Sequence, residues 1–254
     1  MSILTVSYMY FSKRKVKRCR RQFGRRLFAL TVIPALLLSG CQRQTGRNED
    51  GRFEDYTAAL FSAEVAADAV TLHYTLKDPE AYGVTAAAEG FGEVSSDPSQ
   101  VRAAAENMKK ALEGFEYEEL DIRNRITYDI LEYSMENALD NAEYLLYGEP
   151  LGLVSGIQTQ LPVILSEYQF YDSGDVEAYL KLMKSTPEYF DSIIEFERKK
   201  SEEGLFMADY TAETVAEQCT AFLDMGDGNY LYSTFVDRIN ELEELTEKEK
   251  SDYI

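Results

Sequence analysis

The chain has 254 residues and an acidic composition, with 45 Asp and Glu against 26 Lys and Arg and a net charge of −19. This excess of carboxylates argues against a nucleic-acid-binding protein, because neutralising phosphates requires clustered Lys and Arg. The single histidine, His73, excludes any self-contained site that needs two imidazoles, such as a catalytic zinc held by two histidines and a glutamate. The hydrophobic share of 45% is that of a folded globular protein.

The first 40 residues differ sharply from the rest of the chain. Nine of the 26 basic residues lie there without any Asp or Glu, so the remainder carries 17 positive against 45 negative side chains, a net charge of −28. Residues 13–26 form a basic block, and residues 27–38 (LFALTVIPALLL) are uncharged. The uncharged run is shorter than the roughly 20 residues that a membrane-spanning helix needs. This pattern predicts a secretory signal peptide over residues 1–40.

The end of this segment reads Leu-Ser-Gly-Cys at residues 38–41 and resembles the lipobox of bacterial lipoproteins. In that motif cleavage precedes the cysteine, whose thiol is acylated. We therefore expect a lipid such as palmitate on Cys41 to tether an extracytoplasmic protein to the bacterial cell membrane. The alternative is a basic arm followed by a buried helix with an incidental cysteine. The long basic extension leaves two candidate start residues, Met1 and Met9.

The remaining cysteines add no chemistry to this interpretation. Cys19 would leave with the signal peptide and Cys41 would carry lipid, so Cys219 would be alone and could form no intramolecular disulfide. Cys219 shares a predicted helical face with Val215 and Phe222. We therefore predict a small buried hydrophobic residue rather than a nucleophile at this position.

The first half of the mature chain predicts a polar tether followed by helices. Residues 41–52 are polar and predict the tether, and residues 53–75 predict one Ala-rich helix. Asp97 before Pro98 predicts an N-cap and a helix over residues 98–112. In the next helical segment, residues 119–147, four apolar side chains recur at helical spacing and predict the face that packs on the core. They are Ile122, Ile126, Ile130 and Tyr133.

The second half also predicts helices. A glycine-punctuated turn over residues 152–156 leads into a short helix, and Asp172 or Ser173 caps another. Pro187 predicts the start of a separate helix, which Gly204 ends. The remaining predicted helices cover residues 211–225 and 229–245, and Thr246 with Glu249 begins a last one through a capping box. Because this helix begins so near Ile254, we expect the chain to be truncated. Residues 53–254 show no β pattern and predict one all-α unit.

The search for chemical motifs is negative, so we predict no catalytic, cofactor-binding or metal-binding residue. The chain has no His-Glu-x-x-His, Gly-x-Ser-x-Gly, phosphate-binding loop or paired Cys-x-x-Cys. Residues 224–229 (DMGDGN) superficially suggest a calcium loop, but they lack the alternating oxygen ligands and predict a turn. His73, among apolar neighbours near a helix end, predicts a structural, hydrogen-bonded histidine rather than a metal ligand.

The aromatic composition is unusual, with 18 Tyr and no Trp. Several tyrosines gather near the central turns and leave two interpretations open: they line a cleft for a peptide or a sugar, or they pack at the edge of the core. The set consists of Tyr144, Tyr147, Tyr168, Tyr171 and Tyr179.

Four blocks of the sequence resemble the N-terminal half of the DUF885 family. They lie at residues 71–83 (TLHYTLKDPEAYG), 156–170 (GIQTQLPVILSEYQF), 175–180 (DVEAYL) and 204–209 (GLFMAD). The resemblance spans residues 53–254. It implies a bacterial, often lipid-anchored protein related to zinc metallopeptidases, with a mostly helical zincin-like fold.

The chain departs from the family pattern where the chemistry would lie. The resemblance implies a zinc motif of the His-Glu-x-x-x-Gly-His type in a C-terminal half, and no such motif occurs in this sequence. We therefore expect this chain to be the N-terminal portion of a metallopeptidase-like hydrolase whose zinc lies in the missing half. The portion would be inactive by itself, and the substrate of the whole protein would be a peptide. The alternative is a stand-alone helical lipoprotein that binds a peptide or a cell-wall component. A missing half would leave apolar surface exposed, which predicts self-association or poor solubility.

Overall fold

The computed structural model describes residues 48–254, so the predicted signal peptide and Cys41 lie outside the described residues. Across residues 48–254 the chain forms α-helices and short 3-10 helices and has no strand, which confirms the all-α class. Within this range, no helix combines the length and the apolar character that crossing a membrane requires.

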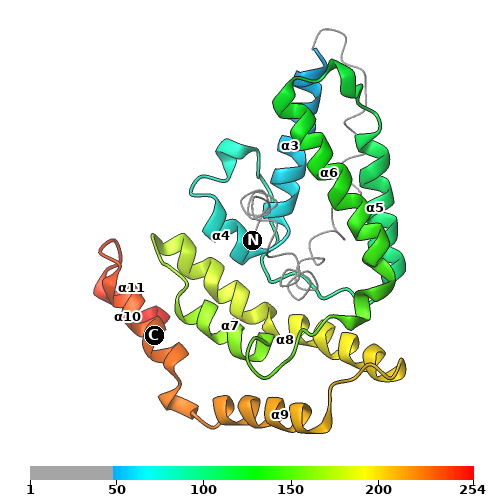
Figure 1. Cartoon of the computed structure of the whole chain (residues 1–254). Coiled ribbons are helices and arrows are strands. Elements are labelled where there is room, and N and C mark those ends of the chain that lie inside the picture. The colour runs from blue at the N-terminus through cyan, green and yellow to red at the C-terminus, as the bar shows by residue number, and fades with distance from the viewer. Residues whose placement is uncertain (1–47) are drawn as a thin grey trace, which may run out of the picture.

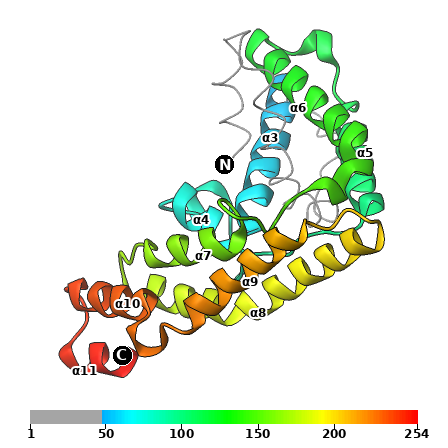
Figure 2. The same cartoon turned by 60° about the horizontal axis from the view of Figure 1, so that its bottom comes forward.

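Three helices form the N-terminal group: α3 (Glu49–Ala66), α5 (Pro98–Leu112) and α6 (Ile122–Asn141) lie side by side (Figures 1 and 2). The predicted cap of α5 is confirmed, because Asp97 accepts a hydrogen bond from the Ser99 backbone N–H at 2.9 Å. The short helix η6 (Tyr117–Glu119) joins α5 to α6. The group buries one core made of Phe53, Leu60, Met108, Leu112, Leu120, Tyr128, Leu131 and Met135.

Helix α3 begins inside the range predicted as a tether. It starts at Glu49, where the side chain of Asn48 accepts a hydrogen bond from the Gly51 N–H at 3.0 Å. The Glu49 carboxylate accepts from the Glu116 N–H at 2.9 Å, and Asp50 accepts from the Asp121 N–H at 2.7 Å. Two acidic residues of a polar segment therefore tie the start of α3 to the segments around α6.

The single helix predicted over residues 53–75 is wrong, because the chain divides into α3 and α4 (Ala69–Thr75). The carboxylate of Asp68 accepts hydrogen bonds from the N–H groups of Val70 and Thr71 and starts α4 as its N-cap. The short helix η5 (Glu80–Tyr82) follows.

The predicted core face of α6 is also wrong. Ile122, Ile126 and Tyr133 are 73%, 53% and 55% exposed, whereas the opposite row, which contains Tyr128 and Leu131, is buried against α3 and α5. The cause lies at the start of the helix. Asn124 donates to the Asp50 carboxylate at 2.9 Å and is itself buried, which turns the Asn124 side of α6 toward α3.

The C-terminal group contains α7 (Ile157–Ser166), α8 (Ser173–Glu202), α10 (Tyr230–Glu241) and α11 (Glu247–Tyr253). The six-residue helix η7 (Ala142–Tyr147) leads out of α6 toward this group. The core of the C-terminal group consists of Leu161, Leu165, Tyr168, Val176, Tyr179, Leu182, Phe235, Ile239, Leu242 and Leu245. Helix α9 (Asp209–Leu223) contacts α7, where the Gln158 side-chain amide donates to Gln218 at 2.9 Å, and buries only Val215 among its own side chains.

Helix α8 corrects the prediction of two helices divided at Pro187. It runs for 30 residues with Pro187 in its interior. Proline removes one backbone donor, but α8 buries residues on both sides of it, including Leu182 and Ile193, so packing holds the two parts in one helix. The predicted end is confirmed: Gly204 has φ 69°, and the Leu205 N–H donates to the Lys200 carbonyl at 2.8 Å.

The last elements follow the sequence signals closely. Asn229 caps α10 by accepting from the Leu231 N–H at 2.9 Å, although α10 ends at Glu241 rather than at residue 245. The predicted capping box of α11 is confirmed, because Thr246 and Glu249 each bond to the other's backbone N–H.

Candidate functional site

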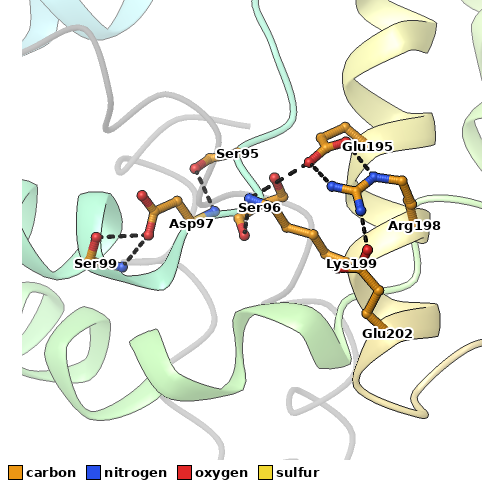
Figure 3. Close-up of polar contacts among 8 residues, drawn as sticks. All are labelled: Ser95, Ser96, Asp97, Ser99, Glu195, Arg198, Lys199 and Glu202. Atoms are coloured by element: carbon orange, nitrogen blue, oxygen red, sulfur yellow. Dashed lines mark hydrogen bonds and ion pairs between the residues drawn. The ribbon is translucent and has the colours of Figure 1, made fainter.

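The chain has a hollow of about 540 Å³ where the start of α5, η7 and the end of α8 meet. Figure 3 shows the loop before α5 opposite the last turns of α8, with the Lys199 side chain between them. The hollow is lined by Ser96, Asp97, Pro98, Glu143, Leu146, Tyr147, Lys199, Glu202, Glu203 and Leu205. Three segments that are distant in sequence therefore contribute to one surface.

Lys199 connects the two sides of the hollow. Its ammonium group donates to the Ser96 carbonyl at 3.5 Å and lies 3.8 Å from the Glu195 carboxylate (Figure 3). Glu195 also accepts two hydrogen bonds from the guanidinium of Arg198, which reaches Glu202 on its other side. Both cations are thus engaged by oxygen atoms of the chain itself.

The remaining lining is acidic. Four carboxylates line the hollow, against the single ammonium of Lys199, and one of the four, Glu202, is paired with Arg198. The other three are Asp97, Glu143 and Glu203. Hydrogen bonds from the side chain and backbone of Ser99 lower the pKa of Asp97, so this carboxylate is ionised at neutral pH. The hollow therefore favours cations.

One residue of the lining belongs to an exposed aromatic pair. Tyr147, 65% exposed, lines the hollow and meets Tyr144 edge to face with 5.9 Å between the ring centroids. The face of a tyrosine ring attracts ammonium and guanidinium groups. Tyr147 therefore adds a second feature that suits a cationic group, beside apolar contacts from Leu146 and Leu205.

A buried ion pair lies on α8 one turn before its end. The side chains of Glu197 and Lys200 are 8% and 4% exposed, with 3.8 Å between their charged groups. Lys200 donates to the Gly148 carbonyl at 2.8 Å, whereas both Glu197 carboxylate oxygens lack a hydrogen-bond partner. Burial raises the pKa of Glu197. This pair fastens α8 to the segment after η7 and thereby positions the hollow.

His73 has a structural environment, as the sequence predicted. Its side chain is 8% exposed, its Nδ1 lies 3.3 Å from the Asp175 carboxylate, and its ring stacks on Tyr168 with 4.0 Å between centroids. Its Nε2 has no hydrogen-bond partner among the described residues. The contacts join α4 to the start of α8.

His73 makes folding sensitive to pH. Burial lowers the pKa of His73 from 6.5, despite the opposing effects of the Asp175 carboxylate and the Gln169 carbonyl. The unfolded chain therefore gains its proton at higher pH than the folded chain, so His73 contributes stability that is present above about pH 6.5 and is lost as pH falls toward its folded pKa. We expect the thermal unfolding midpoint to decrease as the pH is lowered from about 7.5 to about 5.5. The variant His73→Gln should show a smaller decrease over the same pH range. A midpoint with the same pH dependence in both proteins would contradict this role.

The five tyrosines considered from the sequence divide into two groups. Tyr168 and Tyr179 are 1% and 3% exposed and belong to the core, and burial raises the pKa of Tyr168. Tyr144, Tyr147 and Tyr171 are exposed. Of these, Tyr147 lines the hollow. The core interpretation therefore holds for Tyr168 and Tyr179, and a cleft for a peptide or a sugar stays a prediction.

The described residues do not fit a zinc ion. In residues 48–254, no group of three or more His, Cys, Asp or Glu side chains has an arrangement that could hold a metal.

The loop over residues 224–229, predicted as a turn, contains the short helix η8 (Gly226–Gly228) between α9 and α10. Cys219 is half-buried, and burial raises the pKa of its thiol, which disfavours a reactive thiolate.

Reasoning from the sequence missed the hollow. Glu143, Glu202 and Glu203 are three of 45 acidic residues, and no spacing distinguishes them from carboxylates on other helix surfaces. The fold alone brings them beside Asp97, which the sequence singled out only as a helix cap.

Together, these features define an all-helical protein with an open, acidic hollow and a neighbouring buried ion pair. The chain belongs to the DUF885 family, described as bacterial protein of unknown function, because the family model matches residues 82–253. This match confirms the family resemblance found in the sequence. No curated protein and no solved structure matches the chain.

Proposed function

We propose that the chain is the helical binding unit of a membrane-tethered, extracytoplasmic lipoprotein, and that its hollow binds a cationic segment of a peptide. The tether rests on the sequence: a basic block, a short apolar run and Leu-Ser-Gly-Cys at residues 38–41. The lipid on Cys41 would hold the acidic helical body at the membrane surface without a spanning helix.

One observation carries the binding proposal: four carboxylates line the hollow, of which only Glu202 is held by Arg198, while the one lining ammonium, that of Lys199, already contacts oxygen atoms of the chain. A lysine or arginine side chain in the hollow would have the carboxylates of Glu143 and Glu203 and the exposed ring of Tyr147 among its lining. Exposed charge pairs are weak individually, so recognition depends on several carboxylates acting together.

The proposal predicts charge-dependent peptide binding. We expect a fluorescein-labelled Lys-rich peptide to bind the full chain, as measured by fluorescence anisotropy, and a Glu-rich peptide of equal length not to bind. Removing two of the charges with Glu143→Gln and Glu203→Gln should weaken binding roughly threefold to tenfold, as expected for two partly exposed charge pairs. Raised salt should weaken it further.

A matched control separates the hollow from the general acidity of the chain. Glu213→Gln with Glu217→Gln removes the same charge from exposed positions on α9. This control should leave peptide affinity unchanged. Equal losses in both double variants would mean that the peptide responds to net charge, and the hollow would not be its site.

A second proposal follows from the family resemblance: the unit works beside a zincin-like, zinc-bearing peptidase region outside this chain and is inactive without it. Exposed apolar side chains, among them Val154 at 83% and Leu223 at 75%, are consistent with cover by another protein part. Peptide hydrolysis by the purified chain, or stoichiometric zinc in it, would contradict this proposal. Reading the gene beyond codon 254 tests it independently: an open frame with His-Glu followed by Gly-His supports it, and a stop codon favours the stand-alone binding unit.

A further inference from the structure

We propose that the side-chain ammonium of Lys199 is an internal competitor for the peptide: it holds a cation position of the hollow that a peptide lysine takes over when it binds. This inference rests on the proposed function, because it assigns a regulator to the same hollow. The Lys199 side chain runs from the end of α8 toward the loop before α5 (Figure 3). Among the described residues that line the hollow, Lys199 is the only cation.

The Lys199 ammonium already makes contacts of the kind that the hollow offers to a cation. It donates to the Ser96 carbonyl at 3.5 Å on one side and lies 3.8 Å from the Glu195 carboxylate on the other. Its charge also acts on Asp97, whose pKa is lowered by the hydrogen bonds from Ser99 and, to a smaller extent, by Lys199. The ammonium therefore lies among acceptors from both sides of the hollow.

Lys199 is held loosely, in contrast to the next residue along α8. A well-formed N–H···O hydrogen bond is about 2.7–3.2 Å long, so both contacts of Lys199 are long. Lys200 donates to the Gly148 carbonyl at 2.8 Å, and its side chain is 4% exposed, compared with 35% for Lys199. Partly exposed charge pairs are weak, and the lysine stem is flexible. The ammonium of Lys199 can therefore leave its place for solvent at small cost.

Competition follows from the like charges. A peptide lysine attracted by the carboxylates of Glu143 and Glu203 brings a second ammonium into a hollow that already contains one. The two ammonium groups repel each other unless Lys199 turns out to solvent and leaves Ser96 and Glu195 to the guest. The apparent affinity is then the intrinsic affinity multiplied by the fraction of chains in which Lys199 has moved aside. A purely structural contact between α8 and the loop before α5 would have the opposite effect, because its loss would loosen the hollow and weaken binding.

Peptide binding to three variants of the full chain tests the competition by fluorescence anisotropy. Lys199→Met removes the ammonium and keeps an unbranched side chain. We expect the fluorescein-labelled Lys-rich peptide to bind this variant roughly threefold to tenfold more tightly than the wild-type chain, as expected for the loss of one or two partly exposed charge contacts. Lys199→Arg keeps the charge and should not tighten binding. Lys184→Met removes the same charge from an exposed position about four turns earlier on α8, beyond the screening length, and should leave the affinity within about twofold of the wild-type value.

The outcomes separate this inference from the proposed function. Three results would overturn the competition alone: unchanged or weaker binding by Lys199→Met, tighter binding by Lys199→Arg, or equal tightening in Lys199→Met and Lys184→Met. No binding of the peptide to the wild-type chain or to any variant would contradict the proposed function, and the competition with it. Circular dichroism should show equal helix content in all of these proteins, because neither lysine is buried.

Discussion

A Cys41→Ser variant is expected to lose acyl labelling completely and to leave the membrane fraction. The proposed anchor is a lipid on one thiol, and within residues 48–254 no helix could replace it by crossing the membrane. Each buried CH₂ group of an acyl chain contributes about 0.8 kcal/mol to membrane binding, so the loss of all chains removes the main attachment. The measurement is metabolic labelling with palmitate, followed by fractionation of the cells.

The other two cysteines are matched controls for this experiment. Cys19→Ser and Cys219→Ser should keep both the label and the membrane location, because neither residue lies in the Leu-Ser-Gly-Cys motif. Unchanged membrane retention of Cys41→Ser would contradict the lipid tether. Loss of label in the Cys219→Ser variant would mean that Cys219, and not Cys41, carries the lipid.

Phe53→Ala is expected to have the largest effect on stability, a loss of about 3–5 kcal/mol in the free energy of unfolding. Phe53 is 0% exposed, and its ring lies 5.2 Å from that of Phe115 and 6.1 Å from that of Tyr128. Removing the ring leaves a cavity where α3 meets α6. Because domains are typically stable by only about 5–15 kcal/mol, this loss should approach unfolding.

Denaturant unfolding followed by far-UV circular dichroism measures this effect. Phe206→Ala removes the same ring from a side chain that is 45% exposed and should change stability by less than about 1 kcal/mol. Similar losses in the two variants would contradict the role of Phe53 at the centre of the N-terminal core.

Local signals predicted the helix ends well. Asp97, Thr246 and Gly204 act at the backbone groups nearest to them, so their side chains or their conformational freedom decide where a helix begins or ends. Pro187 led to the wrong prediction of two helices. Proline weakens a helix only locally, and the core contacts of α8 on both sides of Pro187 outweigh this local cost. The end of a helix is thus easier to predict than its continuation.

The orientation of α6 could not be predicted from periodicity. The helix carries two apolar rows, and the sequence pattern favours the one with three isoleucines. The choice depends on Asn124 and Asp50, which are distant in sequence and meet through a 2.9 Å hydrogen bond. The hollow was hidden for the same reason, since Asp97, Glu143 and Glu203 become neighbours only through the packing of three segments.

Hydrogen–deuterium exchange of the chain with a bound Lys-rich peptide tests the proposed binding unit most directly. Peptide bound in the hollow should slow exchange at residues 97–101, 143–148 and 199–205, and leave α10 and α11 unchanged, because these helices do not line the hollow. Two results would contradict the account: exchange that is not slowed at the segments lining the hollow, or exchange that is slowed evenly over all the acidic helices.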